Sequence, residues 1–297
     1  MPSRRSAATV TRVPADTTQT YRELLPSAAL APYVSCFWLQ HVSEQGPAYR
    51  HRTVPNGCVE IVASSGQSTL TVIGPQRGPQ VEALAPGAAV IGVRLRPGAT
   101  TALLGIPADS IVDDRIGLED LCGRQATRLA EQLGELDSPE EAPTLLARLL
   151  ELRARDAPAI DPVIACLTHE LQPWHRTRID DLARDLFLSS RQLRRRCLTA
   201  LGYGPKTLQR LLRFQGFLAL SHFHQAGSVA RLAIELGYTD QAHLTRESVE
   251  LAGLAPRRLL SETARSCGAN HDHAASFRTA VRLAGMPAAS GQRRRRR

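Results

Sequence analysis

Arginine and glutamine side chains recur at matching places in two segments of the C-terminal third. The first segment reads LSSRQLRRRC over residues 188–197, and the second reads LGYTDQAHLTRE over residues 236–247. The planar fork of Arg can donate to O6 and N7 of guanine together, and a Gln amide can pair with adenine in the same way. These residue types therefore favour base reading in DNA. The side chains that helical geometry turns outward are Arg191, Arg195, Gln241, His243 and Arg246.

Helical spacing decides which of the three consecutive arginines in the first segment reads a base. Leu193 and Cys197 are four residues apart and face the core, and neighbouring side chains on a helix point about 100° apart. Arg195 is therefore the predicted base reader, while Arg194 and Arg196 are predicted to contact phosphate or solvent. Polar groups at helix starts, with their exposed backbone amides, can hold phosphates. Ser190 and Thr207 are the candidates.

An internal repeat places these side chains. Residues 179–205 and 229–256 share a Leu-Ala pair in a first helix, a short turn, a polar cap and a closing Gly and Pro. The caps are Ser189-Ser190 in one copy and Thr239-Asp240 in the other. Each copy is predicted to be a helix-turn-helix unit, with Ser248 facing inward in the second. A chance repeat in an ordinary helical bundle is the alternative, and the coincidence of cores, turns and caps disfavours it.

One helix is predicted to join the two units. Residues 206–223 carry Leu and Phe at helical spacing, and about 17 residues at ~1.5 Å each span ~25 Å. Successive major grooves lie ~34 Å apart, so this length suits two readers on one DNA face. Gly216 inside the helix suggests a close approach of helices, with a bend in the helix as the alternative. The predicted core positions are Leu208, Leu211, Leu212, Phe217 and Leu220.

The two reading segments, with LAGLAP at residues 251–256, resemble the AraC/XylS family of transcription regulators. The resemblance covers about 100 residues and implies two recognition helices in successive major grooves. Two positions depart from the family: Ser248 stands where Phe or Cys is usual, and Cys197 where Phe is commoner. The resemblance selects Arg191, Gln192 and Arg195 in the first unit and Gln241, Ala242, His243 and Arg246 in the second.

Positive charge is concentrated in the same part of the chain. Residues 1–159 carry 15 Lys/Arg against 17 Asp/Glu, residues 160–260 carry 14 against 9, and residues 261–297 carry 8 against 2. A basic C-terminal part indicates a polyanionic partner, here double-stranded DNA. A regulator of this kind further implies RNA polymerase as a partner, an unidentified small-molecule effector and a candidate homodimer.

The front of the chain is predicted to be rich in strands. Apolar runs at residues 34–39, 59–63, 69–73 and 90–95 alternate with Gly and Pro turns. Stretches such as VPNGCVEIV at residues 54–62 resemble the sensor-like domain that precedes the DNA-binding part in many family members, where acidic residues are common at positions 56 and 60. Its barrel-like fold can hold an effector in a pocket. The candidate lining residues are Trp38, Glu60, Arg94 and Arg96. Two alternatives stay open: Trp38 can be a core residue, and Arg94 and Glu60 can form a structural ion pair.

The predicted fold class is therefore α+β: a strand-rich sensor domain with trailing helices, then an all-α domain. Residues 118–136 have helical spacing, and Ser138-Pro139 caps a further helix. The expected divisions are a flexible lead (1–18), the sensor-like domain (19–137), a helical linker with a hinge at residues 155–158 (138–160), the DNA-binding domain (161–260) and a disordered basic tail (261–297).

Catalytic and metal sites are not expected. The sequence has no Ser/His/Asp set, phosphate loop or dinucleotide motif, and no cofactor or metal is predicted. The alternative function is a ligand- or metal-dependent enzyme domain tethered to a DNA-binding module, with His41, His51 and Glu60 as its scattered ligands and His271-Asp272-His273 as a second weak signal. Six scattered cysteines, no secretory signal and no membrane-length apolar run lead us to expect a cytoplasmic protein with reduced thiols.

Overall fold

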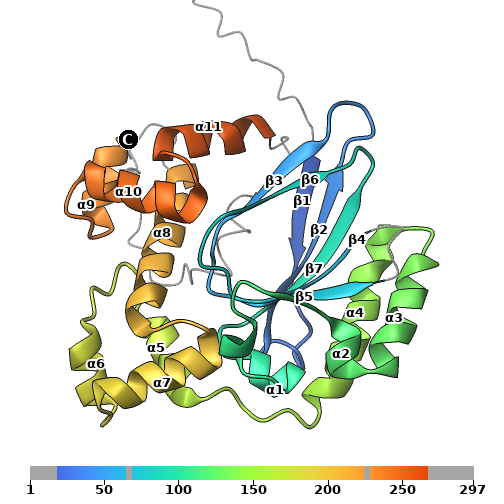
Figure 1. Ribbon diagram of the computed structural model, residues 1–297, viewed down its shortest axis with the longest axis horizontal. Helices are drawn as coiled ribbons and strands as arrows, with labels where there is room; N and C mark the ends of the chain where they lie inside the picture. Colours follow the sequence, from blue (N-terminus) through green and yellow to red (C-terminus); the bar gives the residue numbers. More distant parts are fainter. Residues whose placement is uncertain (1–18, 65–68, 224–227, 267–297) are drawn as a thin grey trace, which may run out of the picture.

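The computed structural model describes residues 19–64, 69–223 and 228–266. Figure 1 shows a strand-rich part in the centre, with α3 and α4 at one edge, and helices α5–α11 gathered on the opposite side. The architecture is α+β with the strands in the N-terminal part, as the sequence predicted. No helix among the described residues is long and apolar enough to cross a membrane.

The strands form two antiparallel sheets. The larger has the order β1-β2-β7-β4-β5-β8, and the smaller pairs β3 with β6. The predicted apolar runs correspond to β2, β4, β5 and β7, whereas no predicted run falls on β1, β3, β6 or β8. The strands are β1 (Gln19–Leu24), β2 (Val34–Val42), β3 (Tyr49–Thr53), β4 (Glu60–Ser64), β5 (Leu70–Ile73), β6 (Gln80–Leu84), β7 (Ala89–Leu95) and β8 (Arg115–Gly117).

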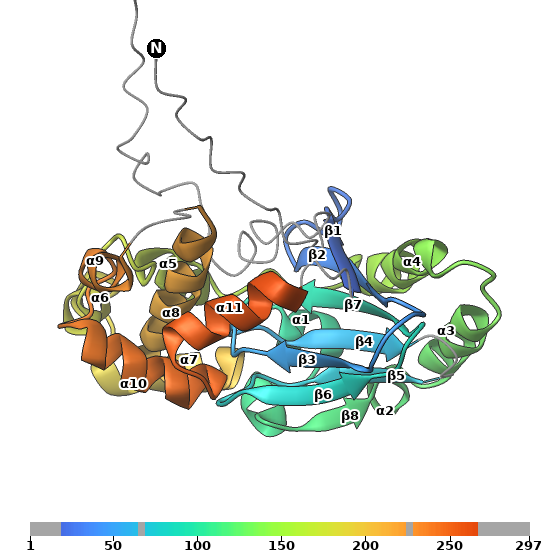
Figure 2. The same ribbon diagram turned by 90° about the horizontal axis from the view of Figure 1, so that it is seen from above.

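The larger sheet uses its two faces differently. Side chains alternate along a strand, so Ile61 and Ala63 of β4 enter the main core while Glu60, Val62 and Ser64 line a cavity on the other face. The smaller sheet lies across that second face, as Figure 2 shows for β3 and β6. The front domain therefore has a barrel-like space between its sheets.

Four helices cover the first face of the sheet: α1 (Thr100–Leu104), α2 (Leu118–Cys122), α3 (Arg124–Gly134) and α4 (Ala142–Ala154). The predicted helix over residues 118–136 is two helices, because Gly123 adopts a φ of 55° between them. The segment 138–160 was predicted to be a helical linker, and it contains the expected helix as α4, whose Leu146 and Leu150 are buried in the sheet core. Short 3₁₀ helices precede α4 (Pro139–Glu141, η2) and follow α1 (Ala108–Ile111, η1).

The junction to the helical domain is short and anchored. The Tyr33 hydroxyl donates to the carbonyl of Ala157 at 2.9 Å, and Ala157 and Ile160 pack against the front core. The predicted hinge at residues 155–158 is thus held against the front domain. The helices that follow are α5 (Pro162–Glu170), α6 (Ile179–Asp185), α7 (Ser190–Leu201), α8 (Pro205–Phe223), α9 (Val229–Glu235), α10 (Gln241–Ala252) and α11 (Pro256–Ser266).

Helix α8 forms the centre of the helical domain. The five apolar positions predicted to be its core are all buried. A Cβ on Gly216 would lie 2.7 Å from Pro173, so only glycine lets the segment before α6 approach the helix this closely. The sequence predicted a close approach of helices at this glycine, whereas the nearest atom belongs to Pro173 in the segment between α5 and α6.

Two predicted segments lie largely outside the described residues: the lead at 1–18 and the tail at 261–297, with His271–His273 and the five terminal arginines. Residues 261–266 are an exception, because they belong to α11, where Leu259 anchors the helix in the core. The tail therefore begins later than the sequence predicted.

Candidate nucleic-acid interface

Helix α7 begins at a capping box. The Ser189 hydroxyl accepts from the Gln192 backbone N–H at 3.2 Å, and the Gln192 side-chain oxygen accepts from the Ser189 N–H at 2.9 Å. This reciprocal pair satisfies two N–H groups that a helix start leaves free. Leu193 and Cys197 are fully buried, so Arg191 and Arg195 are exposed on another face, as predicted.

Helix α10 repeats this design with a different cap. The Asp240 carboxylate accepts from the His243 backbone N–H at 2.7 Å. Leu244 and Ser248 are fully buried, and the Ser248 hydroxyl donates to the carbonyl of Leu254 at 2.6 Å, so the inward position holds a satisfied polar group. The exposed side chains are Gln241, Ala242 and Arg246.

Two predicted readers are partly engaged within the protein. Gln192 uses its side-chain oxygen in the capping box. The rings of His243 and Tyr238 form a T-shaped pair with centroids 5.2 Å apart, and the His243 Nδ1 accepts from the Thr239 backbone nitrogen at 3.4 Å. Base contact by either side chain therefore requires these local contacts to be exchanged, whereas Arg191, Arg195 and Arg246 need no such change.

The predicted phosphate contacts fall into different surroundings. Ser190 is exposed at the start of α7. Arg194 and Thr207 line a cleft between α7, α8 and α10. Arg196 lies 3.3 Å from the Asp161 carboxylate that caps α5, so this side chain has a protein partner on the domain surface.

A buried carboxylate in the second unit was not predicted. Glu247 is 4% exposed, accepts from the Tyr238 hydroxyl at 3.0 Å and lies 3.3 Å from Arg210 of α8. Burial, with Glu247 as a further cause, raises the pKa of Tyr238. An ion pair between α10 and α8 thus fixes the second reader to the connecting helix.

The front domain contacts both units. In the first unit, the Tyr203 hydroxyl just after α7 donates to the carbonyl of Gln76, and η1 packs on α7. In the second, Arg52 of β3 donates to the carbonyl of Ala252 at 2.9 Å and to Glu262 of α11 at 3.1 Å.

Helix α8 is also tied to the front domain. The buried Gln215 side chain donates to the carbonyl of Pro55 at 2.7 Å. Figure 2 shows α11 running alongside the strand-rich part, next to β3. The relative placement of the two units is therefore set partly by the front domain.

The predicted effector pocket coincides in part with the cavity between the sheets. Trp38 and Glu60 line it, whereas Arg94 and Arg96 do not. Arg94 is buried and lies 2.8 Å from Glu60 and 3.1 Å from Glu23, and Arg96 donates to the carbonyl of Ala31. The Arg94–Glu60 pair left open by the sequence is therefore present, because β4 and β7 place the two residues in register.

Trp38 combines the two predicted roles of core and lining. It is 5% exposed and stacks on Tyr21 with ring centroids 6.0 Å apart. A Cβ on Gly92 would lie 2.2 Å from the indole, so glycine at the paired position of β7 makes room for the ring. The lining residues missed from sequence include Gln40, His51 and Gln76, none of which has a local pattern that predicts a pocket.

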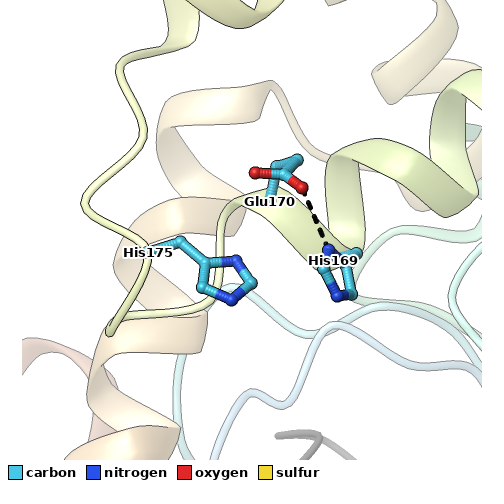
Figure 3. Close-up of side chains that lie close together, drawn as sticks. All are labelled: His169, Glu170 and His175. Carbon is cyan, nitrogen blue, oxygen red and sulfur yellow. Dashed lines mark hydrogen bonds and ion pairs between the residues drawn. The ribbon is translucent and has the colours of Figure 1, made fainter. Parts of the chain in front are cut away.

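One group of potential metal ligands occurs among the described residues. His169, Glu170 and His175 lie at and after the end of α5, with their ligand atoms within 4.8 Å of one another (Figure 3). His169 Nδ1 lies 3.1 Å from the Glu170 carboxylate, and the group is partly exposed. It is in the helical domain, so it lends no support to a metal-dependent enzyme built on His41, His51 and Glu60. His41 instead lies 3.4 Å from Glu140.

Comparisons with known families match both parts of the chain. Residues 22–117 match a family described as a domain of unknown function (DUF6597), and residues 182–262 match a family described as a helix-turn-helix domain. The second match spans α7, α8, α9 and α10. No curated protein sequence matches the chain.

Solved structures of ToxT from Vibrio cholerae are also similar to the chain. ToxT from strain O395 is 14% identical, with a TM-score of 0.40, over 73% of this chain and 97% of that one. An apo ToxT variant from strain SCE256 is 12% identical, with a TM-score of 0.42, over 84% and 99%. ToxT of that strain with bound unsaturated fatty acid is 12% identical, with a TM-score of 0.41, over 72% and 92%.

Proposed function

Because residues 182–262 form an AraC-type helix-turn-helix domain, the domain of a DNA-binding transcription regulator, we propose that this chain reads two successive major grooves with α7 and α10. The observation that carries the proposal is the equivalent exposure of Arg195 and Arg246 on two capped helices. A guanidinium that is exposed and needs no rearrangement can form the bidentate contact to guanine.

The connecting helix supports the two-groove arrangement. Figure 1 shows the α6–α7 and α9–α10 units at opposite ends of α8. Helix α8 has 19 residues, so it is about 28 Å long at 1.5 Å per residue. With the widths of the two units added, this length suits grooves ~34 Å apart on one DNA face.

The base readers in this proposal are Arg191, Arg195, Gln241 and Arg246, with Gln192, Ala242 and His243 beside them. Ser190, Arg194 and Thr207 would contact phosphates, and Arg196 would do so only after leaving Asp161. The front domain, residues 19–160, would respond to an effector held between its sheets. RNA polymerase and a second copy of the chain are the further expected partners, and no catalytic role is assigned.

The test removes one predicted base reader at a time and measures which half of the DNA site loses its contact. A binding site is first recovered by selection from random duplexes. Arg195→Ala and Arg246→Ala should each weaken specific binding by about 1–3 kcal/mol, the value of one bidentate contact, and each should remove a different guanine from methylation interference. Non-specific binding should change much less.

The controls remove equal charge from the same domain. Arg196→Ala on α7 and Arg231→Ala on α9 each lose a guanidinium that already has an acidic partner, so specific affinity should stay nearly unchanged. A selection that enriches no sequence, or an affinity independent of salt, would contradict DNA binding itself. Loss of specificity in Arg196→Ala but not Arg195→Ala would mean that α7 presents a different face.

A further inference from the structure

The cavity between the sheets is large enough for a small molecule. Its volume is about 160 Å³, and a protein cavity of roughly 150 Å³ holds benzene. The strand residues that point away from the main core line it, among them Trp38, Gln40 and Val62. A molecule of about one ring therefore fits.

Three lining residues carry buried polar atoms without a hydrogen-bond partner. They are the indole N–H of Trp38 and the side-chain oxygens of Gln40 and Gln76. Buried polar atoms in folded proteins nearly always have a partner, so these three groups are candidates to bind a further molecule. Neighbouring atoms cover each of these three groups, so a ligand reaches them when the side chains turn toward the cavity. One donor and two acceptors then call for a ligand that accepts once and donates twice.

The charged groups of the lining are already neutralised. Glu60 is paired with Arg94 of the sheet, and Arg115 is paired with Glu82. Glu23 also contacts Arg94, and burial raises the pKa of this second carboxyl, which favours its uncharged form. Burial lowers the pKa of His51, which favours the uncharged imidazole. Within the described lining, every cation thus has an acidic partner, and an ionised ligand would lose its hydration without gaining a counter-charge.

We infer that this cavity binds an uncharged molecule of about one ring that carries at least two N–H or O–H donors and one acceptor. The inference rests on the proposed function, since it specifies the effector that the front domain would recognise. The structure also assigns a route from this ligand to the DNA-binding units, and that route begins at Gln76.

Gln76 belongs both to the cavity and to the contact with the first unit. Its side-chain oxygen is one of the unsatisfied acceptors, while its backbone carbonyl accepts from the Tyr203 hydroxyl. Pro55 has a similar double position, because it lines the cavity and its carbonyl accepts from Gln215 of α8. A ligand that binds the Gln76 amide therefore acts on a residue against which α7 is held.

The first experiment measures binding of matched probes to the full chain. Trp174→Phe leaves Trp38 as the sole tryptophan, so its fluorescence reports on the cavity. The three probes each have one ring. Resorcinol is uncharged and has two O–H donors, benzoate is negatively charged, and toluene is uncharged and has no hydrogen-bonding group. Resorcinol should change the fluorescence saturably and bind at least tenfold more tightly than benzoate or toluene.

Variants then locate the binding. Val62→Phe should fill the cavity and abolish the signal, whereas Val81→Phe makes the same substitution at an exposed position of β6 outside the lining. Gln40→Leu and Gln76→Leu should each weaken resorcinol binding about tenfold and keep the circular dichroism of the parent. These two variants decide the matter if Val62→Phe does not fold.

Equal or stronger binding of benzoate, absence of saturable resorcinol binding, or full binding by Val62→Phe would each overturn the inference. The probe titrations and the cavity variants use no DNA, so their failure is separate from failure of the groove-reading proposal. The route is tested last: saturating resorcinol should change DNA affinity at least threefold in the parent and not in Tyr203→Phe. An equal change in both would overturn the role of Gln76.

Discussion

The two helix-turn-helix units share a backbone design and differ in how polar groups anchor their second helices. The equivalent positions Arg196 and Glu247 show this best, because the Arg196 side chain is 45% exposed and pairs with Asp161, whereas the Glu247 side chain is 4% exposed. The repeat therefore specifies caps and apolar cores, and each unit supplies its own polar attachment. A helix-turn-helix unit can therefore keep its fold while its polar contacts with neighbouring helices change, provided that its apolar core positions are retained.

The turns of the two units differ as well. Phe187 in the first turn adopts a φ of 54° and is 96% exposed, and Gly237 occupies the same place in the second turn with a φ of 80°. A left-handed conformation costs energy for any residue with a Cβ. The first unit carries this conformational cost at Phe187. Because the Phe187 side chain is exposed, packing contributes little stabilisation that could offset it.

The largest expected difference concerns the buried carboxylate. Glu247→Ala should lower the free energy of unfolding by about 2 kcal/mol, because it leaves the buried Tyr238 hydroxyl without its acceptor. Arg196→Ala at the equivalent place should cost less than about 0.5 kcal/mol, as expected for a surface ion pair. Denaturant unfolding followed by far-ultraviolet circular dichroism measures both, and equal losses would show that the anchoring does not differ.

A second comparison addresses the contacts with the front domain. Tyr203→Phe should loosen only the first unit, because it removes one hydrogen bond to that unit. Arg52→Ala should loosen only the second, because it removes the bonds to Ala252 and Glu262. The expected effect is about fivefold faster amide exchange, or ~1 kcal/mol, at residues 198–204 or 250–262 respectively. Exchange that rises across both units in either variant would mean that the units move together.

The smallest expected effects lie in the turns. Phe187→Gly should stabilise the protein by up to about 1 kcal/mol, and Gly237→Ala should destabilise it by about the same amount. A Cβ at Gly237 meets no atom within 4 Å, so backbone conformation alone determines the result. The shift in melting temperature provides the measurement, and a stabilising Gly237→Ala would refute the argument.

The helical domain was predictable because its signals are local. Leucines at helical spacing, the caps at Ser189 and Asp240 and the closing glycines all lie within a few residues of the helices that they define. The burial of Leu193, Leu244 and Ser248 follows from the same spacing. A close approach at Gly216 could also be predicted, but not that its nearest neighbour, Pro173, lies between helices rather than in one.

The front domain was less predictable because its contacts join distant residues. Strand β3 has few apolar side chains, and α4 resembles a linker until its partners in the sheet are known. The bond between Tyr203 and Gln76 joins residues 127 positions apart. Glu247 was missed for another reason, since a carboxylate is expected at the surface unless a partner is known.

The length of α8 has a consequence for how such a chain can vary between relatives. Adding one residue to this helix would rotate everything beyond it by about 100° and advance it by 1.5 Å, so α10 would turn away from the DNA face that α7 reads. The turn before α10 already holds one residue more than the turn before α7, which shows that turns absorb an insertion. Insertions and deletions should therefore accumulate in the turns and leave the 19 residues of α8 unchanged in number.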